Sequence, residues 1–481
     1  MSGPNRFSVD AYYEENPPRA SEQVSVLVRV AGDGSGNGSQ DGPPRRASYG
    51  GRVAEVIVLD RSGSMAYPVT KLESAQKAAC AAIDTLPDGA LVAVLEGTHA
   101  ARMVYPREWM LAPLSPRIRA DVKKAVRELR PSVEGTVMGA WLDAARELLE
   151  TCDAPIRHAT LLTDGRNEHQ SRAALDAAID ACRDVLTCDA RGIGADWDPD
   201  ELLRVVEALH GSAPELSCVG DLAADFTGVM ARLLAAGLPE LWLRVRCGKG
   251  VSLGTAEQLV PMLVDLAQHR DDGAGGIHFA LGPWGDEVRD YTLGFAADPG
   301  AAPAARAHRI ASVELVAGRS REPIPGTRAF VDVRWTDMAP PRTDLQPHQN
   351  LVKRAQRMGA GCRAWLRGDP DAALRHWDEA RALATELNDT EALEWLDRVL
   401  DGRGLRSGLT EEVVKRVLLA HTRSSAFLLP ERAREAVAEP AAPERTEPEP
   451  LVCPDCGRVA VPGARYCENC PYEWPDGEDG R

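Results

Sequence analysis

The stretch VIVLDRSGSM, residues 56–65, ends an apolar run in a set of oxygen-bearing side chains. Its first four residues have the continuous apolar character of a buried β-strand. Asp60, Ser62 and Ser64 follow at alternate positions, with a glycine that lets the backbone curl between the two serines. Oxygens at this spacing can converge above the strand end, where they suit a small hard cation. The alternative is an ordinary turn after a strand, since Asp and Ser are common turn residues.

Segments with strand and helix patterns alternate around this stretch, from residue 53 to about residue 236. Such alternation predicts a doubly wound α/β fold, in which helices cover both faces of a mostly parallel sheet. Ligands of such sheets bind at the carboxyl ends of the strands, which is where Asp60 stands. The predicted strands are 53–59, 90–97 and 158–165, with 189–195 as a short strand or turn. The predicted helices are 71–86, 117–129, 138–152, 172–185, 199–211 and 221–237.

The rest of the chain predicts further units around this domain. Short strands with period-two alternation between residues 238 and 340 indicate an antiparallel β-sandwich. The β pattern of VSVLVRV, residues 24–30, predicts that the N-terminal segment joins the sandwich, so that the α/β domain is an insertion into it. Residues 368–389 resemble part of a tetratricopeptide helix pair, although a helical hairpin docked on the sandwich is the simpler interpretation. The expected boundaries are 1–31 for the N-terminal strand segment, 32–51 for a flexible loop, 52–236 for the α/β domain, 238–340 for the sandwich, 346–428 for the helical region, 439–450 for a Pro/Glu-rich linker and 451–475 for a cysteine-rich module.

Two further stretches place oxygen-bearing side chains beside the first. EGTVMGAWL, residues 134–142, puts Thr136 in a loop before a predicted helix, and TLLTDGR, residues 160–166, ends a strand in Asp164. Together with the stretch that opens at Asp60, they resemble the metal-ion-dependent adhesion site of the von Willebrand factor A domain family. The resemblance covers about residues 52–236, and all of the family's motif positions hold the expected residue types.

This resemblance implies a metal site with an open position. Ser62 and Ser64 would bind Mg²⁺ (or Mn²⁺) directly, and Thr136 would bind it directly or move in with the ligand. Asp60 and Asp164 would supply two negative charges in the first or second shell. Magnesium takes six oxygens, which three hydroxyls cannot supply, so a partner protein's Asp or Glu carboxylate would complete the shell. The implied function is metal-dependent protein binding by a non-enzymatic scaffold.

Two other functions remain open at this point. A magnesium site with open positions also serves phosphoryl transfer, for which Arg166 and His169 could act as clamp and base. The chain has no GxxxxGK[ST] phosphate loop, and polar loop residues that face solvent are the simpler interpretation of both side chains. Some adhesion-site domains instead belong to ATP-driven, chelatase-like machines, in which case the partner would be a separate ATPase of the MoxR type. A signalling protein is a further candidate partner.

A second metal site is indicated near the C-terminus by CPDCGRVAVPGARYCENC, residues 453–470. Two C-x₂-C pairs separated by ten residues predict a closed tetrahedral site for structural Zn²⁺, with iron or disulfides as the alternatives. The module resembles the short zinc ribbons at the ends of bacterial regulatory proteins. Its acidic residues outnumber its basic ones, which favours a protein over a nucleic acid as its contact. The expected ligands are Cys453, Cys456, Cys467 and Cys470.

Composition narrows the classes of partner. The formal net charge is −16, from 72 acidic and 56 basic residues, which argues against a broad nucleic-acid surface. No run approaches 18 apolar residues, so we expect no membrane span. The first residues lack an apolar core, which predicts no secretory signal and a cytoplasmic protein whose seven other cysteines are reduced.

Overall fold

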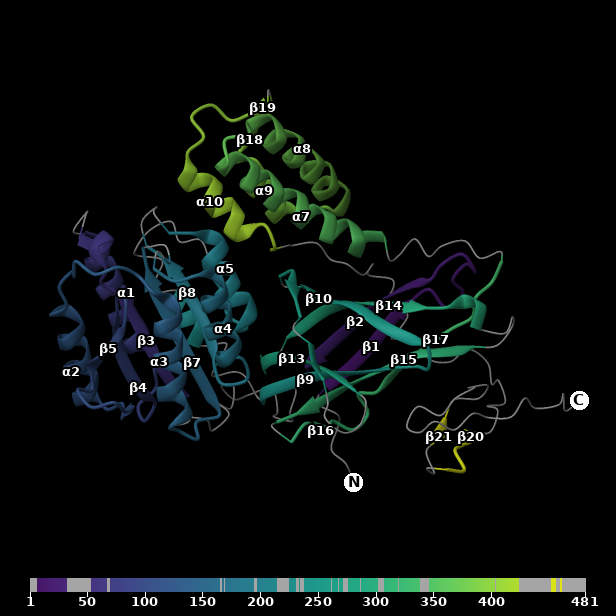
Figure 1. Ribbon diagram of the computed structural model, residues 1–481, viewed down its shortest axis with the longest axis horizontal. Coiled ribbons are helices and arrows are strands. Elements are labelled where there is room, and N and C mark those ends of the chain that lie inside the picture. The colour runs from purple at the N-terminus through teal and green to yellow at the C-terminus, as the bar shows by residue number, and fades with distance from the viewer. Residues whose placement is uncertain are drawn as a thin grey trace, which may run out of the picture.

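The computed structural model describes most of the chain and arranges it in three large units. Figure 1 shows an α/β unit, an antiparallel sandwich beside it, and a helical unit above both. The described residues are 7–32, 53–66, 70–164, 167, 169–193, 197–213, 225–230, 233, 238–260, 262–266, 268–270, 276–285, 287–301, 307–318, 320–337, 346–402, 404–423, 451–455 and 459–460.

The sheet of the α/β unit has the strand order β5-β4-β3-β7-β8, with β3 at its centre. Strands β4, β3, β7 and β8 are parallel, as the alternating sequence pattern predicts. The predicted α/β fold is therefore confirmed, although β5 and the short β6 pair with β4 in the antiparallel direction and were not predicted. The strands are β3 (Val53–Asp60), β4 (Leu91–Gly97), β5 (Ala101–Tyr105), β6 (Ala112–Pro113), β7 (Ile156–Thr163) and β8 (Thr187–Gly192).

Helices cover both faces of this sheet. Apolar residues of α1 and α2 form one core with the sheet, and those of α3, α4 and α5 form another. Trp141 of α3 lies fully buried in the second core, and its indole N–H donates to the carbonyl of Thr98 at 2.7 Å. A Cβ at Gly97 would lie 2.5 Å from this indole, so the close packing of α3 requires a glycine there. The helices are α1 (Thr70–Thr85), α2 (Pro116–Arg127), α3 (Met138–Glu150), α4 (Arg172–Cys182) and α5 (Pro199–Ala208).

The second unit is a sandwich of two antiparallel sheets, with the orders β1-β2-β14-β10-β11 and β12-β13-β9-β15-β16, and β17 also pairs with β15. Strand β2 pairs with β14 from Gln23 opposite Ala296 to Ala31 opposite Val288. Two strands that precede the α/β unit thus lie in a sheet whose other strands follow it. The strands are β1 (Phe7–Tyr13), β2 (Gln23–Gly32), β9 (Leu238–Cys247), β10 (Val251–Val260), β11 (Val264–Asp265), β12 (Gln268–Arg270), β13 (Ile277–Trp284), β14 (Val288–Ala297), β15 (His308–Ala317), β16 (Glu322–Pro323) and β17 (Ala329–Val333).

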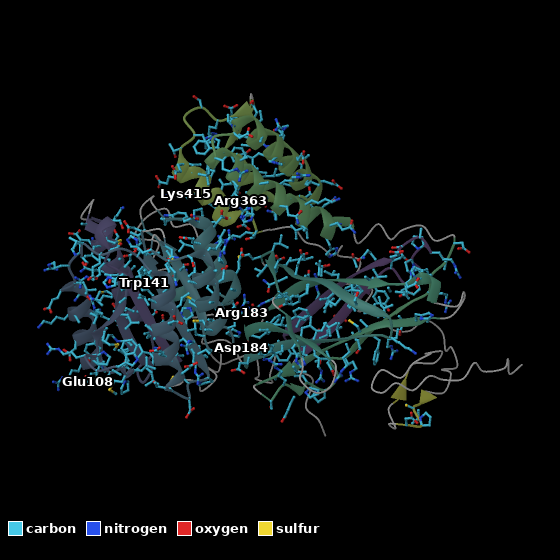
Figure 2. All side chains as sticks on the ribbon, in the orientation of Figure 1. Glu108, Trp141, Arg183, Asp184, Arg363 and Lys415 are labelled. Carbon is cyan, nitrogen blue, oxygen red and sulfur yellow. The ribbon has the colours of Figure 1, made fainter. Side chains whose placement is uncertain are left out.

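The third unit contains the predicted hairpin, formed by α7 and α8, and two more helices. It contacts both other units rather than the sandwich alone. Leu351 of α7 packs with Leu27 and Leu259 of the sandwich, and Arg363 of α7 pairs with Asp200 of α5 at 2.8 Å. Figure 2 shows Arg363 and Lys415 where the helical unit meets the α/β unit. The elements are α7 (Gln346–Leu366), α8 (Pro370–Leu387), α9 (Thr390–Leu396) and α10 (Glu411–Ala420), with the short strands β18 (Leu400–Asp401) and β19 (Gly404–Leu405).

None of the helices that the structure describes is long and apolar enough to cross a membrane. In the C-terminal module, β20 (Leu451–Val452) and β21 (Val459–Ala460) form a two-stranded hairpin.

Candidate metal centre

The central strands of the α/β sheet bring two carboxylates to one edge. Asp60 is the last residue of β3, and Asp164 directly follows the neighbouring strand β7. Because the strands are parallel and Leu59 pairs with Leu162, both side chains leave the sheet at its carboxyl end. The chain then turns through Ser62 and a short 3₁₀ helix, Gly63–Ala66, which carries Ser64.

Asp60 is fully buried and held by two donors. Its Oδ1 accepts the backbone N–H of Ser62 at 2.8 Å, and its Oδ2 accepts the hydroxyl of Thr163 at 2.6 Å. Burial raises the pKa of Asp60 to about 6, against the hydrogen bonds from Ser62 and Thr163, which favour the charged form. The two hydrogen bonds thus fix the orientation of the Asp60 carboxylate, and no described cation lies at ion-pair distance from it.

The two serine hydroxyls lie between the carboxylates. Oγ of Ser62 lies 3.0 Å from Oγ of Ser64, and the Ser64 hydroxyl donates to Oδ1 of Asp164 at 2.7 Å. Asp164 is fully buried, whereas Ser64 is exposed. Hydrogen bonds therefore connect Ser62, Ser64 and Asp164, and the Ser62 backbone connects them to Asp60.

Thr136 lies in the loop before α3, and this loop is attached to the turn after β3. The N–H of Ser132 donates to the carbonyl of Arg61 at 2.7 Å, and that of Gly63 donates to the carbonyl of Glu134 at 3.1 Å. The Thr136 side chain is buried, and its hydroxyl has no hydrogen-bond partner among the described residues. The loop that carries Thr136 is therefore hydrogen-bonded to the turn that carries Ser62 and Ser64. The Thr136 side chain itself is not hydrogen-bonded to the side chains of these two serines.

The loop after β7 packs against the Thr136 loop. A Cβ at Gly135 would lie 2.0 Å from the imidazole of His169, so the two loops approach each other closely at this glycine. His169 is itself exposed, and Arg166 lies outside the described residues. The N–H of Met138 donates to Oδ1 of Asn167 at 3.1 Å, which joins the same two loops a second time.

Lys71 and Thr163 also belong to the centre, and no sequence pattern indicated either of them as a site residue. Nζ of Lys71 lies 2.6 Å from Oδ2 of Asp164, and the two side chains form a buried ion pair. Lys71 stands at the start of the predicted helix 71–86, where a lysine is expected to be an ordinary exposed residue. Only its place in the first turn after the serine loop could have drawn attention to it.

Charged residues form a paired rim beside the centre. Arg61 pairs with Glu96, and Arg102 pairs with Glu134 at 3.4 Å. Val133, which directly precedes Glu134 in the loop before α3, is fully exposed. The rim thus presents pairs of opposite charges and one apolar side chain next to the hydroxyl groups.

The donor set fits a hard cation. Three hydroxyls and two carboxylates offer only oxygen atoms, as Mg²⁺ and Mn²⁺ prefer. Thr136 is 3% exposed, and its hydroxyl would join those of Ser62 and Ser64 as a third neutral oxygen donor. Within the described ranges, no group of three or more His, Cys, Asp or Glu side chains is arranged to hold a metal ion. This centre has only two carboxylates and would not count as such a group.

The expected zinc module is described only in part. Cys453 follows β20 and is buried, while Cys456, Cys467 and Cys470 lie outside the described residues. The short hairpin of β20 and β21 places Cys453 next to a chain reversal, as the knuckle of a zinc ribbon would require.

Comparison with known proteins identifies the α/β unit. Residues 54–214 match the von Willebrand factor type A domain family. A solved structure named von Willebrand factor type A, from Catenulispora acidiphila, is 28% identical, with a TM-score of 0.79 over 88% of this chain and 98% of that one. The ArnB paralog VWA2 from Sulfolobus acidocaldarius is 13% identical, with a TM-score of 0.50 over 87% and 98% of the two chains, and shows a shared fold alone. No curated protein matches the chain.

Proposed function

We propose, from the von Willebrand factor type A domain that this chain contains, that the protein is a non-enzymatic scaffold that binds a partner through a metal ion. Ser62, Ser64 and Thr136 would hold Mg²⁺ or Mn²⁺, and Asp60 and Asp164 would offset its charge. The ion would supply an electrophilic position for an Asp or Glu carboxylate of the partner. The observation that carries this proposal is the pair of serine hydroxyls, 3.0 Å apart, between two fully buried carboxylates.

The chemistry of these residues favours binding over catalysis. The direct ligands would be neutral hydroxyls, so the ion itself would stay electrophilic toward an incoming carboxylate. Phosphoryl transfer needs a cation that contacts the phosphate, and the described ammonium at this centre, that of Lys71, is already paired with Asp164. The exposed His169 packs on Gly135 and has no described carboxylate that would orient it as a base.

We extend the proposal to a second metal in the C-terminal module. Cys453, Cys456, Cys467 and Cys470 would bind structural Zn²⁺ with four thiolates, which leaves no coordination position open. The acidic balance of this module suits a further protein contact. The scaffold would then have two contact points, one dependent on Mg²⁺ and one built around zinc.

Metal titration tests the first part of the proposal. The full chain, stripped with EDTA, should bind about one Mn²⁺ by calorimetry, and Ser62→Ala should weaken that binding about 10–100-fold. Thr85→Ala removes a hydroxyl at the far end of α1 and serves as the matched control. Unchanged Mn²⁺ binding by Ser62→Ala and Asp60→Ala would contradict the assignment of the site.

Partner capture tests the second part. Protein captured from a cell extract in Mg²⁺ and released by EDTA should be absent when Asp60→Ala protein is the bait. Its identity would distinguish an ATPase machine from a signalling protein. A partner that binds Asp60→Ala protein equally well in EDTA would show that the metal does not form the contact.

A further inference from the structure

We propose that Lys71 is a resident positive charge of the metal centre, which weakens binding of the divalent cation and strengthens attraction of the loaded centre for a partner's carboxylate. This inference rests on the proposed function and adds the residue that sets the balance between metal affinity and partner affinity.

The geometry places the charge of Lys71 inside the centre. Its Nζ lies 2.6 Å from Oδ2 of Asp164 and 3.5 Å from the carbonyl oxygen of Ser64. The other oxygen of Asp164 accepts the Ser64 hydroxyl, so both carboxylate oxygens are engaged. Only 8% of the Lys71 side chain and none of the Asp164 side chain is exposed, so salt and water screen this pair poorly.

The charges at the centre are few. Among the described residues, Asp60 and Asp164 are the acidic groups of the centre, and Lys71 is the cation at ion-pair distance from Asp164. The basic residue next in sequence to Asp60 is Arg61, which pairs with Glu96 on the rim instead. With all three groups charged, these three described side chains together carry a net negative charge equal to that of one carboxylate.

Removing Lys71 would shift this balance in two opposite ways. A dication brought to the present centre leaves a net positive charge, whereas the same ion beside two unpaired carboxylates is neutralised. The ammonium therefore repels the metal and attracts the partner's carboxylate through the same Coulomb interaction. A residue that acts by charge in this way changes the two affinities with opposite signs.

A merely structural role predicts a different result. If Lys71 only attached the first turn of α1 to Asp164, its loss would loosen Asp164 and the Ser64 hydroxyl that depends on it. Metal affinity and carboxylate affinity would then fall together. The signs of the two changes therefore separate the electrostatic role from the structural one.

The first measurement is Mn²⁺ binding to the full chain by calorimetry. Lys71→Met removes the charge at similar length, and we expect it to bind Mn²⁺ about tenfold more tightly, a size typical of residues next to metal ligands. Lys71→Gln, which keeps a donor for Asp164, should change in the same direction and replaces Lys71→Met if that variant does not fold. Lys71→Arg should stay within about twofold. Lys123→Met removes an ammonium 2.7 Å from Asp84 in the same domain and should also have no effect.

The second measurement uses glutarate as a carboxylate probe. Glutarate that joins protein-bound Mn²⁺ displaces water, which lowers the enhancement of water-proton relaxation. At saturating Mn²⁺, Lys71→Met and Lys71→Gln should bind glutarate several-fold more weakly than the unsubstituted protein. Unchanged or weaker Mn²⁺ binding by both neutral variants, or unchanged glutarate binding, overturns the inference while the proposed function stands. Failure of the unsubstituted protein to bind Mn²⁺ overturns the proposed function itself.

Discussion

Nε2 of His158 lies 2.8 Å from Oδ2 of Asp189, inside the α/β sheet and near the end opposite the metal centre. The other ring nitrogen lies 2.7 Å from Oε2 of Glu55, and all three side chains are buried. Burial acts to lower the pKa of His158, but the charges and hydrogen bonds of Glu55 and Asp189 outweigh it and raise this pKa to about 10. A charged imidazole therefore joins β3, β7 and β8.

This cluster predicts a loss of stability at high pH. The unfolded imidazole has a pKa near 6.5, so the stabilisation is fully present below about pH 6.5 and is lost as pH rises towards 10. The free energy of unfolding, measured with denaturant, should fall between pH 7 and pH 10. His158→Gln should be less stable by about 3–5 kcal/mol at pH 7, because it leaves buried carboxylates without their cation, and should lose this pH dependence.

The partly exposed His376 of α8 provides the control for this measurement. His376→Gln should change the free energy of unfolding by less than about 0.5 kcal/mol. It should also keep the decline in stability above pH 7. Equal pH profiles for His158→Gln and the unsubstituted protein would mean that the buried imidazole is neutral.

Two ion pairs of α7 differ in burial and should differ in energy. Arg354 and Asp389 are fully buried, and Arg354 also donates to the carbonyls of His421 and Arg423 at 2.6 and 2.7 Å. Arg354→Met should therefore lower the free energy of unfolding by about 3–5 kcal/mol. Arg363 and Asp200 are 40% and 45% exposed, so Arg363→Met should cost at most about 1 kcal/mol. Similar losses for the two variants, measured by denaturant unfolding, would contradict this ranking.

The elements that the sequence predicted well are those that a local pattern of apolar residues defines. The strand that ends at Asp60 and the helices over both faces of the sheet follow from apolar spacing alone. The cluster around His158 was not predicted, because Glu55, His158 and Asp189 stand on three strands and meet only through their register. Strand β10, residues 251–260, was missed because its sequence, VSLGTAEQLV, has no regular apolar alternation and few of its side chains are buried.

The candidate site also divides into residues that a local pattern indicates and residues that it does not. Its hydroxyls and carboxylates could be predicted because each follows a strand or precedes a helix in a familiar motif. Lys71 could not, because its burial depends on how the first turn of α1 packs over Asp164. A single basic residue at a helix start carries no pattern that distinguishes an internal cation from a surface one.

The pairing of β2 with β14 predicts that the N-terminal strands are required by the sandwich. Val26, Val28 and Val30 of β2 are fully buried in its core. Deleting residues 1–32 should expose the edge of β14 and half of that core, so the protein should aggregate or lose cooperative unfolding. Deleting residues 451–481 is the control and should leave the thermal transition of the sandwich unchanged. Equal thermal transitions for the two deletions would contradict the need for β2.

Zinc content provides an independent prediction. Purified protein should contain about one zinc per chain by elemental analysis, because two C-x₂-C pairs supply four thiolates. The double variant Cys453→Ser and Cys467→Ser should lose it and keep the main thermal transition, since a Pro/Glu-rich stretch separates the module from the three large units. Cys80→Ser, which changes a buried thiol of the α/β unit, should keep the zinc. Full zinc content in the double variant would rule out the proposed ligands.

Asp60 provides the most direct link between the metal and the stability of the fold. A ligand that binds only the folded state stabilises it by about 2.7 kcal/mol at 100 times its Kd, so Mn²⁺ should raise the melting temperature of the unsubstituted protein. Asp60→Asn should lose this shift, because it removes one of the two carboxylates that offset the ion. In EDTA the variant should remain folded, since its amide oxygen can still accept the N–H of Ser62 and the residue lies at a strand end. Asp121→Asn, on the exposed face of α2, should keep the full Mn²⁺ shift. A shift of equal size in Asp60→Asn would mean that the ion binds elsewhere in the chain.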